Sequence, residues 1–288
     1  MSNITDSLDC AGLHIHAVEI VKNAELLLRD CPDGDIRYPV YSVTKSVTSA
    51  AFSLACDDGL VTADMPLAEL LDSSLVPLMP ESFRSLPFSR FLTMTAGIYP
   101  FRPEGDSWLT HCISISPAQP DSGFHYSNIP AYFVGTALEN AVGGSLMDYL
   151  DRRLVQPLCI PKPKFRTCPQ GHFYGATGME LSVGELSLLG QLYLHNGSWQ
   201  SRQLISEAAV REAVTPRIST GSGDSYGYFF RVADDHVSMV RKWGQRCMVY
   251  PEAGLVIAYL SHQPERSDEL YAFMRGVARD VISGNNPR

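Results

Sequence analysis

The sequence lacks the patterns that mark several common functional classes. It has no C-x-x-C pair and its seven cysteines are widely spaced, so neither a zinc ribbon nor a dithiol redox site is indicated. It has no block of basic residues and its formal net charge is −8, which argues against nucleic acid as a partner. No apolar run reaches the length of a membrane helix. We therefore expect no membrane or nucleic-acid partner, no metal and no cofactor.

The N-terminus also lacks the features of an export signal. Residues 1–12 are polar, include Asp6 and Asp9, and show neither a basic region nor an apolar region. We therefore expect a cytoplasmic location, in which the cysteines remain reduced. What is present is 288 residues with 45% hydrophobic and 19% charged side chains, which is typical of a globular enzyme with a sizeable core. Nothing in the sequence indicates an oligomeric state.

The hydrophobic periodicity changes twice along the chain. Period-2 patterns predict a hairpin near the N-terminus, at residues 14–21 and 25–29. Helical patterns follow, and strands return near the C-terminus before a last helix. The expected helices are residues 43–58, 90–95, 131–141, 146–155, 183–196, 206–214 and 268–282. The expected C-terminal strands are residues 226–232, 237–242, 247–251 and 255–262.

This order predicts an α+β fold, an α/β sandwich. One antiparallel sheet is built from both chain termini and flanked by helices, and the central part of the chain forms a mostly helical insertion. We expect a single catalytic domain over residues 1–288, with a sheet subdomain at approximately 10–60 and 220–288 and a helical subdomain at approximately 61–219. Such a layout creates a cleft between sheet and helices, where enzymes commonly place their sites.

The segment Ser42-Val43-Thr44-Lys45 is a candidate nucleophile with its base. If Ser42 begins the helix predicted at 43–58, Lys45 lies one turn later on the same face and its amine can reach the serine hydroxyl. Free N–H groups at the helix start would add positive potential for a developing oxyanion. Taken alone, the same residues are more often a helix cap followed by a solvated lysine. A basic lysine also requires burial or a neighbouring cation.

Tyr126-Ser127-Asn128 is the second candidate cluster. It lies in a turn-rich stretch ahead of a predicted helix. The tyrosine could relay protons, and the amide could hold both a lysine and a substrate carbonyl. A buried tyrosine beside a turn asparagine is the structural alternative.

Lys242-Trp243-Gly244 is the third cluster, at the end of a predicted strand. The chain has only five lysines, and two of them fall in these clusters. A second ammonium near Lys45 would lower its pKa. Gly244 would let a substrate approach the backbone, and the N–H of Gln245 could donate to an oxyanion.

The three clusters together resemble the motifs of the serine β-lactamase and penicillin-binding protein superfamily. S-x-x-K, Y-x-N and K-x-G each occur once, in the family's order, and Y-x-N is the form used by the class C branch, which includes esterases, D-aminopeptidases and amide hydrolases. Residues 92–97, 176–179 and 243–245 resemble further family strings. The resemblance implies the β-lactamase/transpeptidase-like fold.

The resemblance also implies roles for individual residues. Ser42 would be the acylated nucleophile, Lys45 its base, and Tyr126 the group that protonates the leaving group and activates the deacylating water. Asn128 and Lys242 would position and polarise the substrate. The backbone N–H groups of Ser42 and Gln245 would form the oxyanion hole.

One departure from the family pattern narrows the expected substrate. Trp243 stands where β-lactamases have Thr or Ser, whose hydroxyl helps to bind a substrate carboxylate; Arg246 is the candidate replacement. We therefore expect a serine hydrolase that acts on a small-molecule ester or amide. The alternatives are a D-amino-acid-type peptidase, a transacylase, a weak β-lactamase, or a non-catalytic binding protein on the same fold.

Three other features are candidates with less support. Ser225 lies in a G-x-S-x-G sequence, but a strand pattern follows it where a nucleophile elbow needs a helix. His14 and His16 alternate on a predicted strand without an evident third metal ligand. Five aromatic residues near the motifs line either an acyl pocket or the core: Tyr99, Phe101, Trp108, Phe124 and Trp243.

Overall fold

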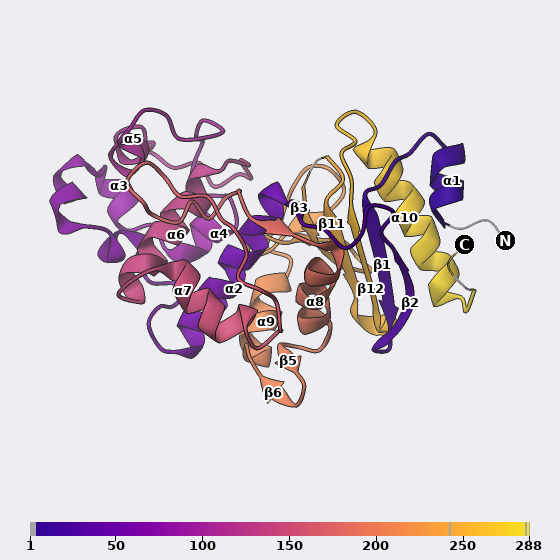
Figure 1. Cartoon of the computed structure of the whole chain (residues 1–288). Coiled ribbons are helices and arrows are strands. Elements are labelled where there is room, and N and C mark those ends of the chain that lie inside the picture. Colours follow the sequence, from indigo (N-terminus) through magenta and orange to yellow (C-terminus); the bar gives the residue numbers. More distant parts are fainter. Residues whose placement is uncertain (1–3, 242, 286, 288) are drawn as a thin grey trace.

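Both ends of the chain meet in one antiparallel sheet (Figure 1). The computed structural model describes residues 4–241, 243–285 and 287. Its main sheet has eight strands in the order β2-β1-β12-β11-β10-β9-β8-β7. These are β1 (Ala17–Lys22), β2 (Glu25–Asp30), β7 (Ile218–Ser219), β8 (Ser225–Tyr226), β9 (Arg231–Val232), β10 (Val237–Val240), β11 (Arg246–Tyr250) and β12 (Leu255–Leu260). Two small pairs lie outside it: β3 (Tyr38–Pro39) with β4 (Glu180–Leu181), and β5 (Ser198–Trp199) with β6 (Arg202–Gln203).

Helices lie along the chain between and around these strands. The α-helices are α1 (Ile4–Cys10), α2 (Thr44–Asp57), α3 (Glu81–Arg84), α4 (Phe88–Leu92), α5 (Trp108–Ser114), α6 (Ile129–Ala141), α7 (Leu146–Leu150), α8 (Val183–Leu194), α9 (Glu207–Val214) and α10 (Ser267–Ile282). The 3₁₀ turns are η1 (Tyr41–Val43), η2 (Leu67–Leu70), η3 (Ser73–Leu78) and η5 (Pro251–Ala253), and η4 (Asp151–Val155) is a π-helical turn. None of the described helices combines the length and the apolar character needed to span a membrane.

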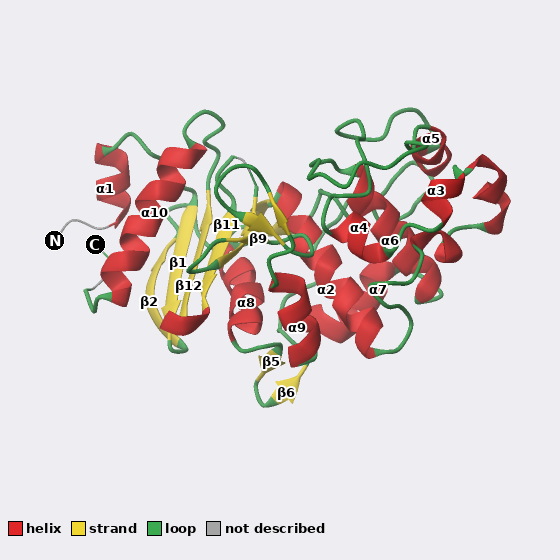
Figure 2. Cartoon of the chain, turned by 180° about the vertical axis from the view of Figure 1, so that it is seen from behind, coloured by secondary structure: helices red, strands yellow, loops and turns green. Residues whose placement is uncertain are grey.

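The sheet is covered on both faces, which explains why every residue of β12 is buried (Figures 1 and 2). Side chains alternate along β11: Cys247 and Val249 join the large core beneath α8, while Met248 and Tyr250 join a smaller core beneath α1 and α10. Helix α8 lies very close to the sheet because Gly190 has no side chain; a Cβ there would clash with Cys247 Sγ. The alternation therefore fixes which side chains of the C-terminal strands face the helical part of the chain.

Helix α2 connects the sheet to the helical part. It is buried from Thr44 to Ala55 and packs against α6 and α9, while η1, which leads into it, contacts β10. A helix buried along nearly its whole length holds its first turn rigidly. The segment that begins with Ser42 is therefore fixed where sheet and helices meet.

The predicted α+β architecture is confirmed, including the N-terminal hairpin. The single strand predicted at 226–232 is wrong. This segment instead contains the end of β8 and all of β9, joined by a turn in which Gly227 N–H donates to Phe230 O at 3.0 Å. The N–H groups of Tyr228 and Phe229 donate to carbonyls of the helical part, at Ala213 and Leu92, so they are unavailable to the sheet.

Further local features differ from the predictions. The helix predicted at 90–95 is α4, which lies earlier and ends at Leu92, because Met94 has a left-handed φ of +60°. The helix predicted at 146–155 is α-helical only to Leu150 and continues as the π-helical η4. The short helix α1 was not predicted, although Ile4 and Leu8 are spaced one turn apart and pack in the core beneath α10. Its burial depends on contacts distant in sequence.

Candidate active site

Ser42 lies at the centre of the short 3₁₀ turn η1, immediately before α2. Val40 N–H donates to Met179 O at 3.0 Å, which ties the entry of this turn to the segment that follows residue 176. Tyr41 has a φ of +48°, a left-handed conformation that a bulky side chain rarely adopts. Strain of this kind concentrates at functional sites, where surrounding contacts maintain it.

Lys45 is only 1% exposed, and its amine has three polar contacts. Nζ lies 3.3 Å from Ser42 Oγ, 2.7 Å from Asn128 Oδ1 and 2.9 Å from the carbonyl oxygen of Ala176. The spacing of three residues on the helix brings Ser42 and Lys45 together, as the sequence predicts. Asn128 and Ala176 come from distant segments and complete the coordination of the amine.

Burial is the main reason that the pKa of Lys45 is lowered. The guanidinium of Arg241 lowers this pKa further, while Tyr126 acts in the opposite direction. No carboxylate contributes to this pKa among the interactions of the described residues. Burial and a neighbouring cation are the two conditions under which a lysine becomes a base near neutral pH.

Tyr126 and Asn128 are brought to Lys45 by the turn that leads into α6. Asn128 precedes the first residue of α6, and its N–H donates to Phe101 O at 2.9 Å. Ser127 Oγ donates to Pro100 O at 2.6 Å and holds the same turn in place. Tyr126 is 37% exposed, and its ring centroid lies 4.9 Å from Lys45 Nζ. Its side chain is thus partly open to solvent while its ring borders the lysine.

The third cluster lies in the loop between β10 and β11, and Lys242 is outside the described residues. The rings of Trp243 and Tyr41 meet edge to face at 6.0 Å, which places this loop beside Ser42. Gly244 has a φ of +98°, and a Cβ there would lie 3.0 Å from Ser261 Cβ. Both observations explain why glycine occupies this position.

Gln245 is 3% exposed, and its side-chain amide donates to the carbonyl of Ser261. Its carbonyl oxygen accepts from Arg241 N–H at 2.9 Å, which closes the loop between β10 and β11. Within the described part of the chain, its own N–H has no hydrogen-bond acceptor. This N–H is therefore not committed to a protein acceptor among the described residues. The oxyanion role of Ser42 and Gln245 stays a prediction.

Two candidates from the sequence lie elsewhere. The guanidinium carbon of Arg246 lies 3.6 Å from the ring centroid of Tyr271 in α10, so it points to the opposite face of the sheet and does not replace the missing hydroxyl near Trp243. It has the same parity along β11 as Met248, which faces α10. Ser225 begins strand β8, so no nucleophile elbow exists there.

The remaining histidine and aromatic candidates have separate surroundings. His14 contacts Asp9 Oδ1 at 3.0 Å, and His16 stacks on Tyr38. Among the aromatic candidates Tyr99 packs in the core, Phe101 is 61% exposed, Phe124 contacts Tyr126, and Trp108 borders a cavity beside α5.

Arg241 is a candidate site residue that sequence reasoning missed. Its guanidinium carbon lies 3.2 Å from the ring centroid of Tyr41 and 3.7 Å from that of Trp243. It makes no ion pair with a carboxylate of the described residues, and its Nη1 is buried without a hydrogen-bond partner among them. Arg241 directly precedes the third cluster in the sequence, and this position could have identified it as a candidate. Ala176 begins the family-like string 176–179, but nothing in the sequence indicated that its carbonyl contacts Lys45.

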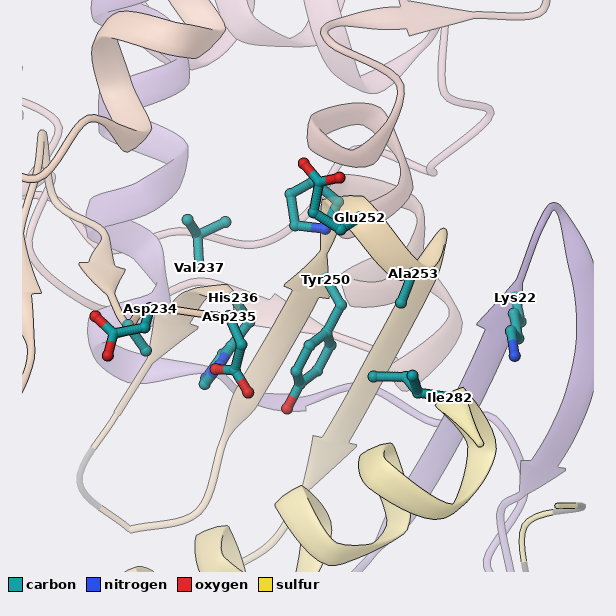
Figure 3. Close-up of a pocket in the computed structure, with 11 residues that line it drawn as sticks. Lys22, Asp234, Asp235, His236, Val237, Tyr250, Glu252, Ala253 and Ile282 are labelled. Atoms are coloured by element: carbon teal, nitrogen blue, oxygen red, sulfur yellow. The ribbon is translucent and has the colours of Figure 1, made fainter. Parts of the chain in front are cut away.

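A larger cavity lies away from these residues, at the far end of β11 (Figure 3). It has a volume of about 720 Å³ and is bordered by Asp235, His236 and Tyr250. Tyr250 lies five residues beyond Gln245 in the chain, or roughly 16 Å along the strand. It contains none of the candidate residues.

Comparisons with known proteins concern the family and the fold. The sequence profile of the Beta-lactamase family matches residues 29–278. A Bacillus anthracis protein provisionally described as a 6-aminohexanoate-dimer hydrolase is similar in structure, with a TM-score of 0.81, 16% identity, and coverage of 96% of this chain and 80% of that one. A penicillin-binding protein homologue from Caulobacter crescentus has a TM-score of 0.72, 16% identity and 90% coverage of both chains. A penicillin-binding protein from Bacillus halodurans has a TM-score of 0.72, 15% identity, and coverage of 95% and 99%. No curated protein sequence matches the chain.

Proposed function

The chain belongs to the beta-lactamase family, whose members are generally serine hydrolases, and from this premise we propose that it forms an acyl-enzyme on Ser42 with a small-molecule ester or amide. Lys45 is the base that activates Ser42 in this proposal, and Tyr126 transfers protons to and from the leaving group. The proposal extends the family's reaction class to individual residues of this chain.

The contacts of Lys45 carry the proposal. A neutral amine has two N–H donors and one lone pair. The carbonyl oxygens of Asn128 and Ala176 take the two donors at 2.7 and 2.9 Å, which leaves the lone pair for the hydroxyl of Ser42 at 3.3 Å. The lowered pKa of Lys45 favours this neutral form. In this neutral form the amine is directed at the nucleophile.

The proposed reaction has two stages, acylation of Ser42 and hydrolysis of the acyl-enzyme. Ser42 Oγ attacks the carbonyl carbon while its proton passes to Lys45, and the oxyanion is stabilised by the N–H groups of Ser42 and Gln245. When the intermediate collapses, Tyr126 gives its proton to the departing alcohol or amine and regains one from Lys45. Water next attacks the acyl-enzyme, and its proton passes through Tyr126 to Lys45. Ser42 takes that proton as the acid leaves.

Trp243 and Arg246 favour an esterase or amidase over a β-lactamase. Trp243 replaces the hydroxyl that assists carboxylate binding, and Arg246 faces α10. Hydrolysis of a p-nitrophenyl ester that exceeds turnover of nitrocefin would support this preference. A D-amino-acid-type peptidase would prefer a D-aminoacyl p-nitroanilide, and a transacylase would respond to an added alcohol or amine acceptor.

An acyl-enzyme should be visible directly as a burst. Rapid mixing with excess p-nitrophenyl acetate is expected to release about one p-nitrophenol per chain before the steady rate, because acylation by an activated ester precedes slower deacylation. Intact-mass spectrometry of the quenched sample should show one added acetyl group. Release without a covalent adduct would contradict the acyl-enzyme. Absence of both release and adduct would favour a non-catalytic binding protein.

Arg241 is expected to contribute to the pH at which the activity appears. The rate requires neutral Lys45, so kcat/KM rises as pH rises through the pKa of Lys45. Arg241 lowers this pKa, and the variant Arg241→Gln should therefore shift the acid limb of the pH profile to higher pH. Arg246→Gln removes the same charge from the opposite face of the sheet and should leave the limb in place. An unshifted limb in Arg241→Gln would contradict the electrostatic role.

A further inference from the structure

A second cavity, of about 340 Å³, adjoins the candidate active site at the start of α5. Its wall includes two arginines, Arg102 and Arg166, and two aromatic rings, Trp108 and Tyr174. The two rings meet edge to face at 4.9 Å, and the guanidinium carbon of Arg166 lies 5.7 Å from both centroids. The cavity therefore combines positive charge with flat apolar surface.

Tyr174 belongs both to this cavity and to the surroundings of the catalytic lysine. Its side chain interacts with that of Asn128, which accepts from Lys45 Nζ at 2.7 Å. Burial raises the pKa of Tyr174, while Asn128, Arg166 and Arg102 act to lower it. One side chain thus connects the cavity to Ser42 and Lys45.

Backbone contacts tie the segments that carry the two arginines to the surroundings of the candidate active site. Arg102 follows Phe101, whose carbonyl accepts from Asn128 N–H at 2.9 Å. Arg166 O accepts from Tyr174 N–H at 3.0 Å, and the backbone of Arg166 packs against Gly178, where a Cβ would lie 3.1 Å from Arg166 N. The cavity is thus built from the segments that supply the proposed catalytic residues.

The two positive charges have no negative partner in the protein. Neither arginine forms an ion pair within the described residues, although the chain as a whole carries a net charge of −8. Glu104 also borders the cavity but contacts neither guanidinium at ion-pair distance. Both arginines are exposed, so their guanidinium groups are open to an incoming ligand, and a bound anion would meet two positive charges that form no ion pair among the described residues.

We propose that this cavity binds an anionic group of the substrate, a carboxylate or a group of similar charge, and that the aromatic pair receives the apolar carbon beside it. The substrates would then be esters or amides that carry a negative charge away from the scissile carbonyl. This inference rests on the proposed function of Ser42, because it concerns the specificity of that site.

Matched ester pairs test the inference. One pair is the mono-p-nitrophenyl ester of adipate and the methyl ester of the same compound, which differ in the terminal charge of the acyl group; suberate extends the acyl chain. A second pair, 4-carboxyphenyl acetate and phenyl acetate, places the charge on the leaving group. We expect kcat/KM for the charged member of at least one pair to be about tenfold higher, the value of one charge-assisted hydrogen bond.

The ratio of kcat/KM within a pair should fall to near one in the double variant Arg102→Gln/Arg166→Gln, and it should shrink as salt is added. The control Arg202→Gln removes an exposed arginine from strand β6 and should keep the wild-type ratio. A wild-type ratio near one in both pairs, or an unchanged ratio in the double variant, would overturn the inference while leaving the acyl-enzyme intact.

A binding measurement separates this inference from the catalytic proposal. Calorimetric titration of Ser42→Ala with monomethyl adipate, alone and combined with the double variant, requires no turnover. Weaker binding in the combined variant supports the cavity even if no ester is cleaved. Equal affinity, or no binding to either protein, contradicts it.

Discussion

Replacement of Ser42 by alanine is expected to abolish covalent labelling by a fluorophosphonate probe and to lower ester hydrolysis by a factor of about 10³ or more. The hydroxyl of Ser42 is the group that the amine of Lys45 faces at 3.3 Å, so no other side chain can take over the attack with the same base. Ser42 is partly exposed in η1, and loss of one hydroxyl there should leave the fold unchanged. Intact-mass spectrometry of labelled protein and p-nitrophenol release are the measurements.

Ser225→Ala is the matched control for this experiment. Ser225 lies in the G-x-S-x-G sequence but begins strand β8, without a helix after it. Its variant should label and turn over like the wild type. An adduct that persists in Ser42→Ala, or one that disappears in Ser225→Ala, would refute the choice of nucleophile.

The architecture of the sheet could be predicted because its strands carry a simple alternating pattern. In β11 the residues that face α8 alternate with those that face α10, and such periodicity can be read from sequence. The break at Gly227 could not be predicted from the pattern. Tyr228 and Phe229 are as apolar as strand residues, but their N–H groups donate to the carbonyls of Ala213 and Leu92. Those partners are brought near only by the completed fold.

In the candidate site, too, some contacts join residues near in sequence and others join distant segments. Ser42 and Lys45 are one helical turn apart, so their proximity follows from local geometry. The burial of Lys45 and its contact with Ala176 O depend on how three distant segments pack. The direction of Arg246 could have been predicted from the sequence. It has the same parity along β11 as Met248, which places its side chain toward α10 and away from Trp243.

Tyr126→Phe is expected to slow turnover by about 10² to 10⁴, the usual contribution of one general acid–base group. The substitution removes only the hydroxyl, so the ring keeps its position 4.9 Å from Lys45 Nζ and its contacts with Phe124 and Tyr226. Acylation by esters with good leaving groups, which need little protonation, should fall less than acylation by amides. The slope of log kcat/KM against leaving-group pKa should therefore steepen in the variant.

Tyr226→Phe provides the comparison, because it removes a hydroxyl from the ring next to Tyr126. Tyr226 is 3% exposed, and burial raises its pKa well above the usual value, so it is poorly placed to exchange protons with a substrate. Its variant should retain turnover within a few-fold and the wild-type leaving-group slope. If Tyr126→Phe behaved in the same way, proton transfer would have to be assigned to Lys45 alone. The lone pair of Lys45 faces Ser42 Oγ. Lys45 would then have to accept the proton of Ser42 and afterwards give it to the leaving group.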